Sequence, residues 1–350
     1  MDISTILAQA IESKASDIFI VAGAPLTFKI HGVIQKRGDV ILKPHDTRNL
    51  IEQIYQYRNG KHDIKAIGED DFSFSLSNLG RFRVNVYYQR GSLAAVLRVV
   101  SFELPNYKEL MIPESVMNLS NLTKGLVLVS GSAGAGKSST LACLIDRINH
   151  MRTAHIITIE DPIEYIHRHD LSIVSQREIS NDTTSYLNAL RAALRQAPNV
   201  ILVGEMRDLD TIQTVIQAAE TGHLVLSTLH TNDAPESINR IINVFPSEQQ
   251  AQIRVQLSMV LQAIVAQQLL PSKQGKMLPA FEVMLANTAI RTQIRDNKIH
   301  QIHNSIINGK QEGMITMDES ITMLYQQGLI SKETALLYSK DSEFLKRKLV

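Results

Sequence analysis

The stretch from Gly131 to Ser138 has the residue types and spacing of a site that binds phosphate. Its sequence, GSAGAGKS, matches the pattern G-x-x-x-x-G-K-[ST] of phosphate-binding loops. Its glycines let the backbone wrap a phosphate with the N–H groups pointing inward. Lys137 is expected to reach the β- and γ-phosphates of a nucleotide, and the Ser138 hydroxyl to ligate Mg²⁺. We therefore predict that the nucleotide is held by Gly131, Ser132, Ala133, Gly134, Ala135, Gly136, Lys137, Ser138 and Ser139.

The flanks of this stretch place it between a strand and a helix. Residues 125–130 form a short apolar run typical of a buried strand, and residues 139–148 carry apolar side chains at helical spacing. A helix that begins at the loop adds the positive end of its dipole at the same point. A chance match in a glycine-rich turn is the alternative, and the presence of both flanking elements counts against it.

Glu205 is the acidic residue that the sequence places best to act on water. It follows the apolar run 199–204, which resembles a Walker B strand except that Gly204 stands where an Asp is usual. We predict that Glu205 orients or deprotonates the attacking water and also contributes to a metal site. The alternative is an exposed acidic residue at the start of a helix.

A second group of acids, Glu160, Asp161 and Glu164, follows the predicted strand 154–159. Carboxylates this close together repel one another unless a cation or hydrogen-bond donors compensate their charge. We predict that Mg²⁺ does so, directly or through water, with Ser138, Glu160 and Glu205 at the metal and Glu164 in a catalytic role. A solvated acidic turn is the alternative for each residue taken singly.

Two histidines, His223 and His230, bracket the predicted strand 223–229. A strand of that length holds them roughly 23 Å apart, which argues against one shared metal ion. His230, at the carboxyl end, is predicted to sense the γ-phosphate. His223, at the other end, has either a structural role or a part in binding the nucleotide.

Arginines are dense in the predicted strands of the first hundred residues, at positions Arg81, Arg83, Arg90 and Arg98. One or two of them could act as arginine fingers, which stabilise the charge that develops on a transferring phosphoryl group. A solvated basic face of the sheet is the alternative, with even weight for any one of them.

From about residue 123, apolar strands alternate with helices, which predicts a parallel sheet covered on both faces. Ligands bind beyond the carboxyl ends of the strands in such sheets, and the phosphate-binding loop, Glu160, Glu205 and His230 are all predicted to lie there. From Ser237 onward the pattern is nearly all helical. It predicts one long helix from Gln249 to Leu270 and shorter helices at 288–295, 300–308, 318–326 and 332–338.

The first hundred residues predict a smaller α+β domain with an antiparallel sheet. Helices are expected at 3–14 and 47–57, and strands at 16–21, 27–34, 72–76, 81–88 and 93–100. Prolines at 105 and 113 mark a connecting segment. We place a domain at 1–100, a linker at 101–122, an α/β core at 123–270 and a helical region at 271–350.

Composition narrows the class of protein. The 350 residues include 36 Lys and Arg against 35 Asp and Glu, which counts against a generally basic protein that binds nucleic acid. The single cysteine, Cys143, excludes an intrachain disulfide and a four-cysteine zinc site, and is expected in the core. Neither a signal peptide nor a transmembrane helix is predicted, so membrane contact is expected only through partners.

Four motifs in order resemble the secretion-type ATPases of type IV pili and type II secretion, most closely the PilT-like retraction ATPases. They are GSAGAGKSST (Walker A), ITIEDPIEYIH (Asp box), LRQAPNVILVGEMRD (Walker B) and AAETGHLVLSTLHTNDA (His box). The later segment AIRTQIR is similar to the AIRNLIR element of the retraction branch. Ala197 and Asn199 stand where the family has acids, and Ser132 stands where it usually has Pro.

The resemblance implies a PAS-like N-terminal domain, a RecA-like P-loop ATPase core and a homohexamer that binds ATP between the domains. It also implies arginine fingers at Arg83 and Arg98. Such a motor would be cytoplasmic, at the inner face of the cytoplasmic membrane. It would act through a PilC-like platform protein to retract type IV pili and so power twitching motility.

Other functions are also compatible with the sequence. One is an accessory retraction ATPase, or a pilus or secretion assembly ATPase of the same family. One cysteine and a short N-terminus argue against the assembly and secretion branches. A nucleic-acid translocase would share the core, but nothing supplies a basic groove that tracks a strand. A scaffold that binds ATP without hydrolysing it is the last alternative, and Lys137 and Glu205 speak against it.

Overall fold

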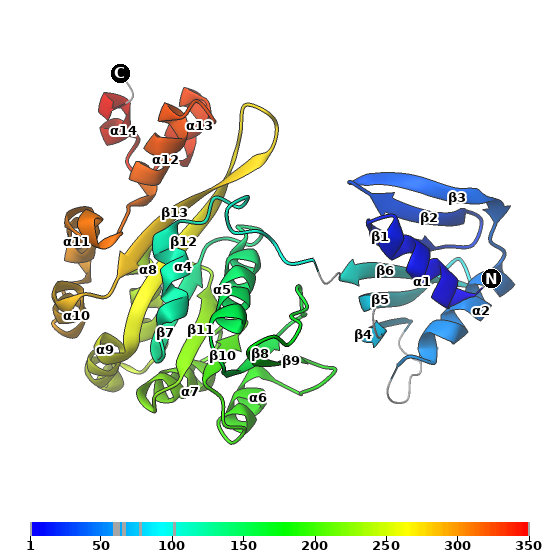
Figure 1. Cartoon of the computed structure of the whole chain (residues 1–350), viewed down its shortest axis with the longest axis horizontal. Coiled ribbons are helices and arrows are strands. Elements are labelled where there is room, and N and C mark those ends of the chain that lie inside the picture. The colour runs from blue at the N-terminus through cyan, green and yellow to red at the C-terminus, as the bar shows by residue number, and fades with distance from the viewer. Residues whose placement is uncertain (1, 59–63, 65–67, 77–78, 101–102, 349–350) are drawn as a thin grey trace. The chain divides into compact units, whose positions relative to one another are not determined.

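A computed structural model describes residues 2–58, 64, 68–76, 79–100 and 103–348. The chain divides into two compact units, each built on its own sheet (Figure 1). The first comprises Met1–Glu103 with Glu164–Ile166, and the second comprises Leu104–Ile163 with His167–Val350. Of the predicted linker 101–122, residues 104–122 belong to the second unit and Glu103 to the first, while Ser101 and Phe102 lie outside the described residues.

The first unit is an antiparallel six-stranded sheet in the order β3-β2-β1-β6-β5-β4. Two helices supply apolar side chains to one core with the sheet, including Leu7 and Ile51 against Phe28 and Phe82. The α+β prediction for this region is therefore confirmed. In chain order the elements are α1 (Ile3–Glu12), β1 (Ala15–Ile20), β2 (Pro25–Ile30), β3 (Val33–Ile41), α2 (Pro44–Tyr55), β4 (Glu69–Leu76), β5 (Gly80–Gln89) and β6 (Ser92–Val100).

The single strand predicted at 27–34 is wrong. His31 and Gly32 both adopt left-handed backbone angles, with φ of 51° and 81°. Two such residues make the tight turn that best fits the twist of a hairpin. The chain therefore reverses, and β3 pairs back on β2 with Val33 opposite Ile30.

The second unit is built on a seven-stranded sheet in the order β13-β12-β7-β11-β10-β8-β9, parallel except for β13 (Figure 1). Helices cover both faces: α5 packs on one core, and α6, α7, α8 and α9 pack on the other. The α/β prediction is confirmed. The elements are α4 (Glu114–Met117), β7 (Gly125–Ser130), α5 (Lys137–Met151), β8 (His155–Glu160), β9 (Ile173–Glu178), α6 (Tyr186–Ala193), β10 (Val200–Val203), α7 (Leu209–Glu220), β11 (Leu224–Leu229), α8 (Ala234–Asn243), α9 (Ser247–Val260), β12 (Leu261–Pro271) and β13 (Met277–Leu285).

The long helix predicted from Gln249 to Leu270 is also wrong. Helix α9 ends at Val260, and the next eleven residues form β12, which pairs in parallel with β7. A strand that is buried on both faces shows a nearly continuous apolar run, which periodicity alone does not separate from a buried helix. Because β12 turns directly into β13, the sheet continues past residue 270, and 271–350 is not entirely helical.

The four shorter helices predicted in this region are confirmed. Helices α12 and α13 pack through Ile321 and Ala335 against Ala266 and Ala280 of the β12–β13 hairpin. Within the described residues, no helix is long and apolar enough to span a membrane. The C-terminal helices are α10 (Thr288–Arg295), α11 (Ile302–Asn308), α12 (Met317–Gln326), α13 (Lys332–Tyr338) and α14 (Ser342–Lys348).

Candidate nucleotide-binding and hydrolysis site

The phosphate-binding loop connects the carboxyl end of β7 to the start of α5, as the sequence predicts. Gly131, Gly134 and Gly136 adopt φ angles of 147°, 76° and 88°, which side-chain-bearing residues rarely adopt. A Cβ on Gly131 would stand 2.3 Å from the carbonyl oxygen of Gln267 on β12. The glycines are therefore needed both for the curvature of the loop and for its close approach to the neighbouring strand.

Lys137 crosses this loop instead of extending into solvent. Its side chain donates hydrogen bonds to the carbonyl oxygens of Gly131 at 2.8 Å and Ser132 at 2.9 Å. Gly136 precedes α5 without capping it through a side chain, so the first N–H groups of the helix can face an anion. The phosphates of a nucleotide fit this site. The loop can surround them, and the buried Lys137 ammonium and the uncapped N–H groups at the start of α5 can bind their negative charge.

Glu205 and His230 meet at the carboxyl edge of the same sheet. Glu205 follows β10 and His230 follows β11, and these strands are parallel neighbours. Oε2 of Glu205 lies 3.6 Å from Nε2 of His230. The Glu205 side chain is only 12% exposed, and it lines a hollow of about 380 Å³ together with His230. The prediction that these two residues gather at one edge is confirmed, while their chemical roles stay predictions.

Arg207 is a site residue that the motif analysis did not single out. Its Nη2 lies 2.7 Å from Oε1 of Glu205, and this hydrogen bond is the main cause of a raised pKa for the Arg207 guanidinium. The signal was present in the sequence, because an arginine two residues after a strand-end glutamate lies within reach of it. Arg207 and His230 together fix the direction of the Glu205 carboxylate.

Tyr186 explains why glycine stands at position 204. A Cβ on Gly204 would lie 2.9 Å from Oη of Tyr186 and 3.2 Å from the carbonyl oxygen of Ile159. Burial raises the pKa of the Tyr186 phenol, and the negative charges of Glu205, Asp161 and Glu160 raise it further. An aspartate at position 204 would therefore clash with a phenol that already occupies this space.

The predicted acidic cluster is not assembled as a metal site by protein atoms alone. Glu160 accepts hydrogen bonds from Oγ1 of Thr158 at 2.6 Å and from Nε2 of Gln176 at 3.2 Å, so donors already compensate its charge. Glu164 lies exposed in the loop after β8. No group of three or more His, Cys, Asp or Glu side chains that could hold a metal occurs in the described part of the chain. Mg²⁺ commonly takes ligands from phosphates and water, so a role for Ser138, Glu160 and Glu205 stays a proposal.

His223 is at the wrong edge of the sheet to touch a phosphate on the chain's own loop. Its carbonyl oxygen accepts a hydrogen bond from the N–H of Gly125, at the amino end of β7. The loop leaves the other end of that strand, roughly 20 Å away. The His223 ring bonds to the carbonyl oxygen of Ala218 at 2.9 Å, where it closes the end of α7. These contacts give His223 a structural role at the end of α7, and its part in binding a nucleotide stays a prediction.

Arg83 and Arg98 are direct cross-strand neighbours on β5 and β6 of the first unit. Arg83 is exposed. Arg98 has a partner, because its Nε donates to Oδ1 of the buried Asp17 at 3.1 Å. Their assignment as arginine fingers stays a prediction, and Arg98 has in addition a structural contact that the sequence did not reveal.

Cys143 lies in the core beside α4, as expected. Burial raises the pKa of its thiol to about 12, and its Sγ lies 3.2 Å from the carbonyl oxygen of Pro105. A thiol with such a pKa is not a nucleophile at neutral pH.

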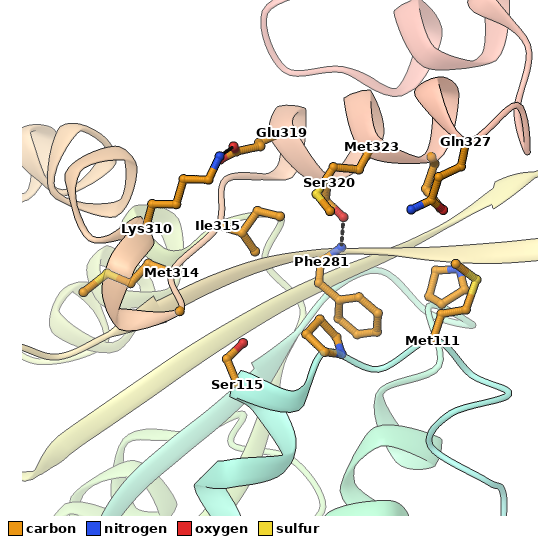
Figure 2. Close-up of a pocket in the computed structure, with 14 residues that line it drawn as sticks. Met111, Ser115, Phe281, Lys310, Met314, Ile315, Glu319, Ser320, Met323 and Gln327 are labelled. Atoms are coloured by element: carbon orange, nitrogen blue, oxygen red, sulfur yellow. Dashed lines mark hydrogen bonds and ion pairs between the residues drawn. The ribbon is translucent and has the colours of Figure 1, made fainter.

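A second hollow, of about 330 Å³, lies between β13, α12 and the segment before α4 (Figure 2). Its walls are mainly apolar, with Met111, Phe281, Met314 and Met323 around it, and the ion pair between Lys310 and Glu319 stands beside it. The Ser320 hydroxyl accepts a hydrogen bond from the N–H of Phe281 at 3.0 Å, which Figure 2 marks. None of the predicted site residues lines this hollow.

Comparisons with known proteins give a consistent result. The family model described as type II/IV secretion system protein matches residues 1–344. The chain is 41% identical to the type IV pilus retraction ATPase PilT of Pseudomonas aeruginosa, over 98% of this chain and 99% of that protein. It is 39% identical to the type IV pilus ATPase PilU of the same organism, over 99% and 91%. A crystal structure of the pilus retraction motor PilT with bound ADP matches with a TM-score of 0.89 and 47% identity, covering 99% of both chains.

Proposed function

This chain belongs to the family of type II/IV secretion system proteins, and we propose that it is a motor that retracts type IV pili. The observation that carries the proposal is the near-complete match to a pilus retraction motor in both sequence and fold. The loop geometry and the pairing of Glu205 with His230 and Arg207 support the same function.

The chain is an ATPase, and each residue of the site has a role that follows from where it lies. ATP supplies the phosphoryl group that is transferred to water. Lys137 and the first N–H groups of α5 hold the phosphates against the loop. Glu205 orients the attacking water and accepts its proton, because it is a carboxylate held in one direction at the strand edge. His230, beside Glu205 at the end of β11, would sense the γ-phosphate.

A magnesium ion is part of this proposal. Ser138 is placed in the first turn of α5, next to Lys137, where its hydroxyl is suited to Mg²⁺. Glu160 and Glu205 lie at the ends of two adjacent parallel strands, β8 and β10, and would hold the ion directly or through water. Glu164, in the loop that follows β8, would support the ion or the attacking water.

We further propose that copies of this chain form a homohexamer, with Arg83 and Arg98 acting as arginine fingers on ATP. The motor would be located in the cytoplasm at the inner face of the membrane and would act on a PilC-like platform protein. The absence of a helix that could span a membrane, among the described residues, is consistent with contact through a partner.

An accessory role is the second candidate, because the identity to PilU is nearly as high as the identity to PilT. The two roles separate in a strain that lacks every retraction ATPase. If this chain is the retraction motor, expressing it alone restores twitching, and expressing the Glu205→Gln variant does not. If the chain restores twitching only together with a PilT, the accessory role is correct.

A further inference from the structure

Gln267 is a buried amide on β12 that faces the phosphate-binding loop. Its Oε1 accepts a hydrogen bond of 2.8 Å from Oγ1 of Thr140, which is completely buried in the first turn of α5. The backbone carbonyl oxygen of Gln267 packs on Gly131. The side-chain Nε2 of Gln267 would stand 2.7 Å from a Cβ on Gly136. Gln267 therefore touches the loop at its first glycine, at its last glycine and on the helix that follows.

The register of the sheet explains this placement. Ala266 pairs with Ser130, the last residue of β7, so Gln267 stands beside the point where the loop leaves the sheet. A buried amide is costly unless its polar atoms have partners. An apolar side chain at this position would leave the Thr140 hydroxyl buried without this acceptor.

We propose that Gln267 is a positioning residue that holds the phosphate-binding loop in the shape that binds phosphate. Its Oε1 fixes the start of α5 through Thr140, and its Nε2 turns the donor end of the amide toward Gly136 behind the phosphates. The amide thus sets the distance between the loop and the helix whose N–H groups face the nucleotide.

The two ends of this amide can be tested separately. Gln267→Leu removes both contacts. Gln267→Glu keeps an acceptor for Thr140 but replaces the donor with a carboxylate oxygen, whose negative charge repels phosphate. Thr140→Val removes only the hydrogen bond to α5. If Gln267→Leu does not fold, the other two variants still test the proposal.

The neighbouring Gln268 provides a matched control. It is another glutamine on β12, half-buried where Gln267 is buried, and its Nε2 donates to the carbonyl oxygen of Tyr338 at 3.1 Å, on α13. Gln268→Leu therefore removes a comparable hydrogen bond without touching the loop.

The experiment measures the dissociation constants of ADP and of adenosine for each purified full-length variant. The proposal depends on nucleotide binding at the loop, which titration of the wild-type protein with ADP establishes first. Gln267→Leu and Gln267→Glu should weaken ADP binding by about tenfold or more and leave adenosine binding unchanged. Gln268→Leu should leave both constants unchanged, and Thr140→Val combined with Gln267→Leu should be less than additive. Equal losses for ADP and adenosine, or no loss for ADP in any Gln267 variant, would overturn the proposal.

Discussion

Nε2 of His230 lies 3.6 Å from Oε2 of Glu205, so the imidazole at the end of β11 shares its carboxylate partner with the guanidinium of Arg207. This pairing orients the Glu205 carboxylate, which we propose acts on the attacking water. Glu205→Gln should keep nucleotide binding and lower ATP turnover by about a hundredfold or more, because an amide cannot accept the proton of water. Steady-state turnover and ADP affinity, measured side by side, check this.

Glu236→Gln is the matched control for that variant. Glu236 lines the same hollow, but its Oε2 accepts from the N–H of Asn232 as part of the start of α8. Its turnover should stay close to that of the wild type. If Glu205→Gln lost ADP binding as strongly as turnover, Glu205 would be a binding or structural residue rather than the base.

Gly204 should resist substitution because of Tyr186. Gly204→Ala places a Cβ 2.9 Å from the Tyr186 hydroxyl, and overpacking of this kind costs about 1–3 kcal/mol of the free energy of unfolding. Tyr186→Phe removes the oxygen and should recover part of that loss in the double variant. Denaturant melts of the two single variants and the double variant check this. Additive losses would show that the two residues are not in contact.

Glu282 should make stability depend on pH in an unusual direction. Its side chain is 1% exposed; Oε1 accepts from the N–H of Ala234, and Oε2 has no hydrogen-bond partner among the described residues. Burial raises its pKa from 4.5 to about 7. The folded state therefore binds a proton that the unfolded state releases, and stability falls as pH rises from about 4.5 to about 7.

Replacing the Glu282 carboxyl group tests whether it makes stability fall as pH rises. Glu282→Gln keeps the acceptor for Ala234 and removes the ionisation, so its stability relative to the wild type should rise between pH 5 and pH 8 by up to about 3 kcal/mol. Denaturant melts of both proteins at a series of pH values give the comparison. A constant difference across this range would exclude the raised pKa.

Arg98 and Arg83 should behave differently although they are cross-strand neighbours. Asp17 is 8% exposed and bonds to Arg98, so Arg98→Ala should lower the melting temperature, while Arg83→Ala should not. If both are arginine fingers, both variants also lose turnover. Asp17→Asn combined with Arg98→Ala should restore the melting temperature but not the turnover. Recovery of both would make Arg98 purely structural.

The sequence predicted the parts of the fold and site that depend on local patterns. Two such features are the glycine-rich loop between a strand and a helix, and Glu205 two residues after the end of a strand; both depend on residues close together in the chain. Partners from distant segments were not predictable in this way. Gln267, Tyr186 and Asp17 meet their contacts only through sheet register and packing. The error at 249–270 has the same origin, because only the presence of β7 decides that this apolar run is a strand.

The proposed hexamer should make the subunits depend on one another. If Arg83 and Arg98 act on ATP held by a neighbouring copy, each active site needs two chains, as in a closed ring. Mixing a small fraction of Glu205→Gln subunits into wild-type protein should then lower turnover more than in proportion to that fraction. Glu236→Gln subunits at the same fraction serve as the control and should have no effect.

Turnover per subunit should also rise with protein concentration wherever dilution dissociates the ring. Mass measurement with nucleotide present gives the size of the assembly directly, and a monomer with turnover that is independent of concentration would rule out the ring.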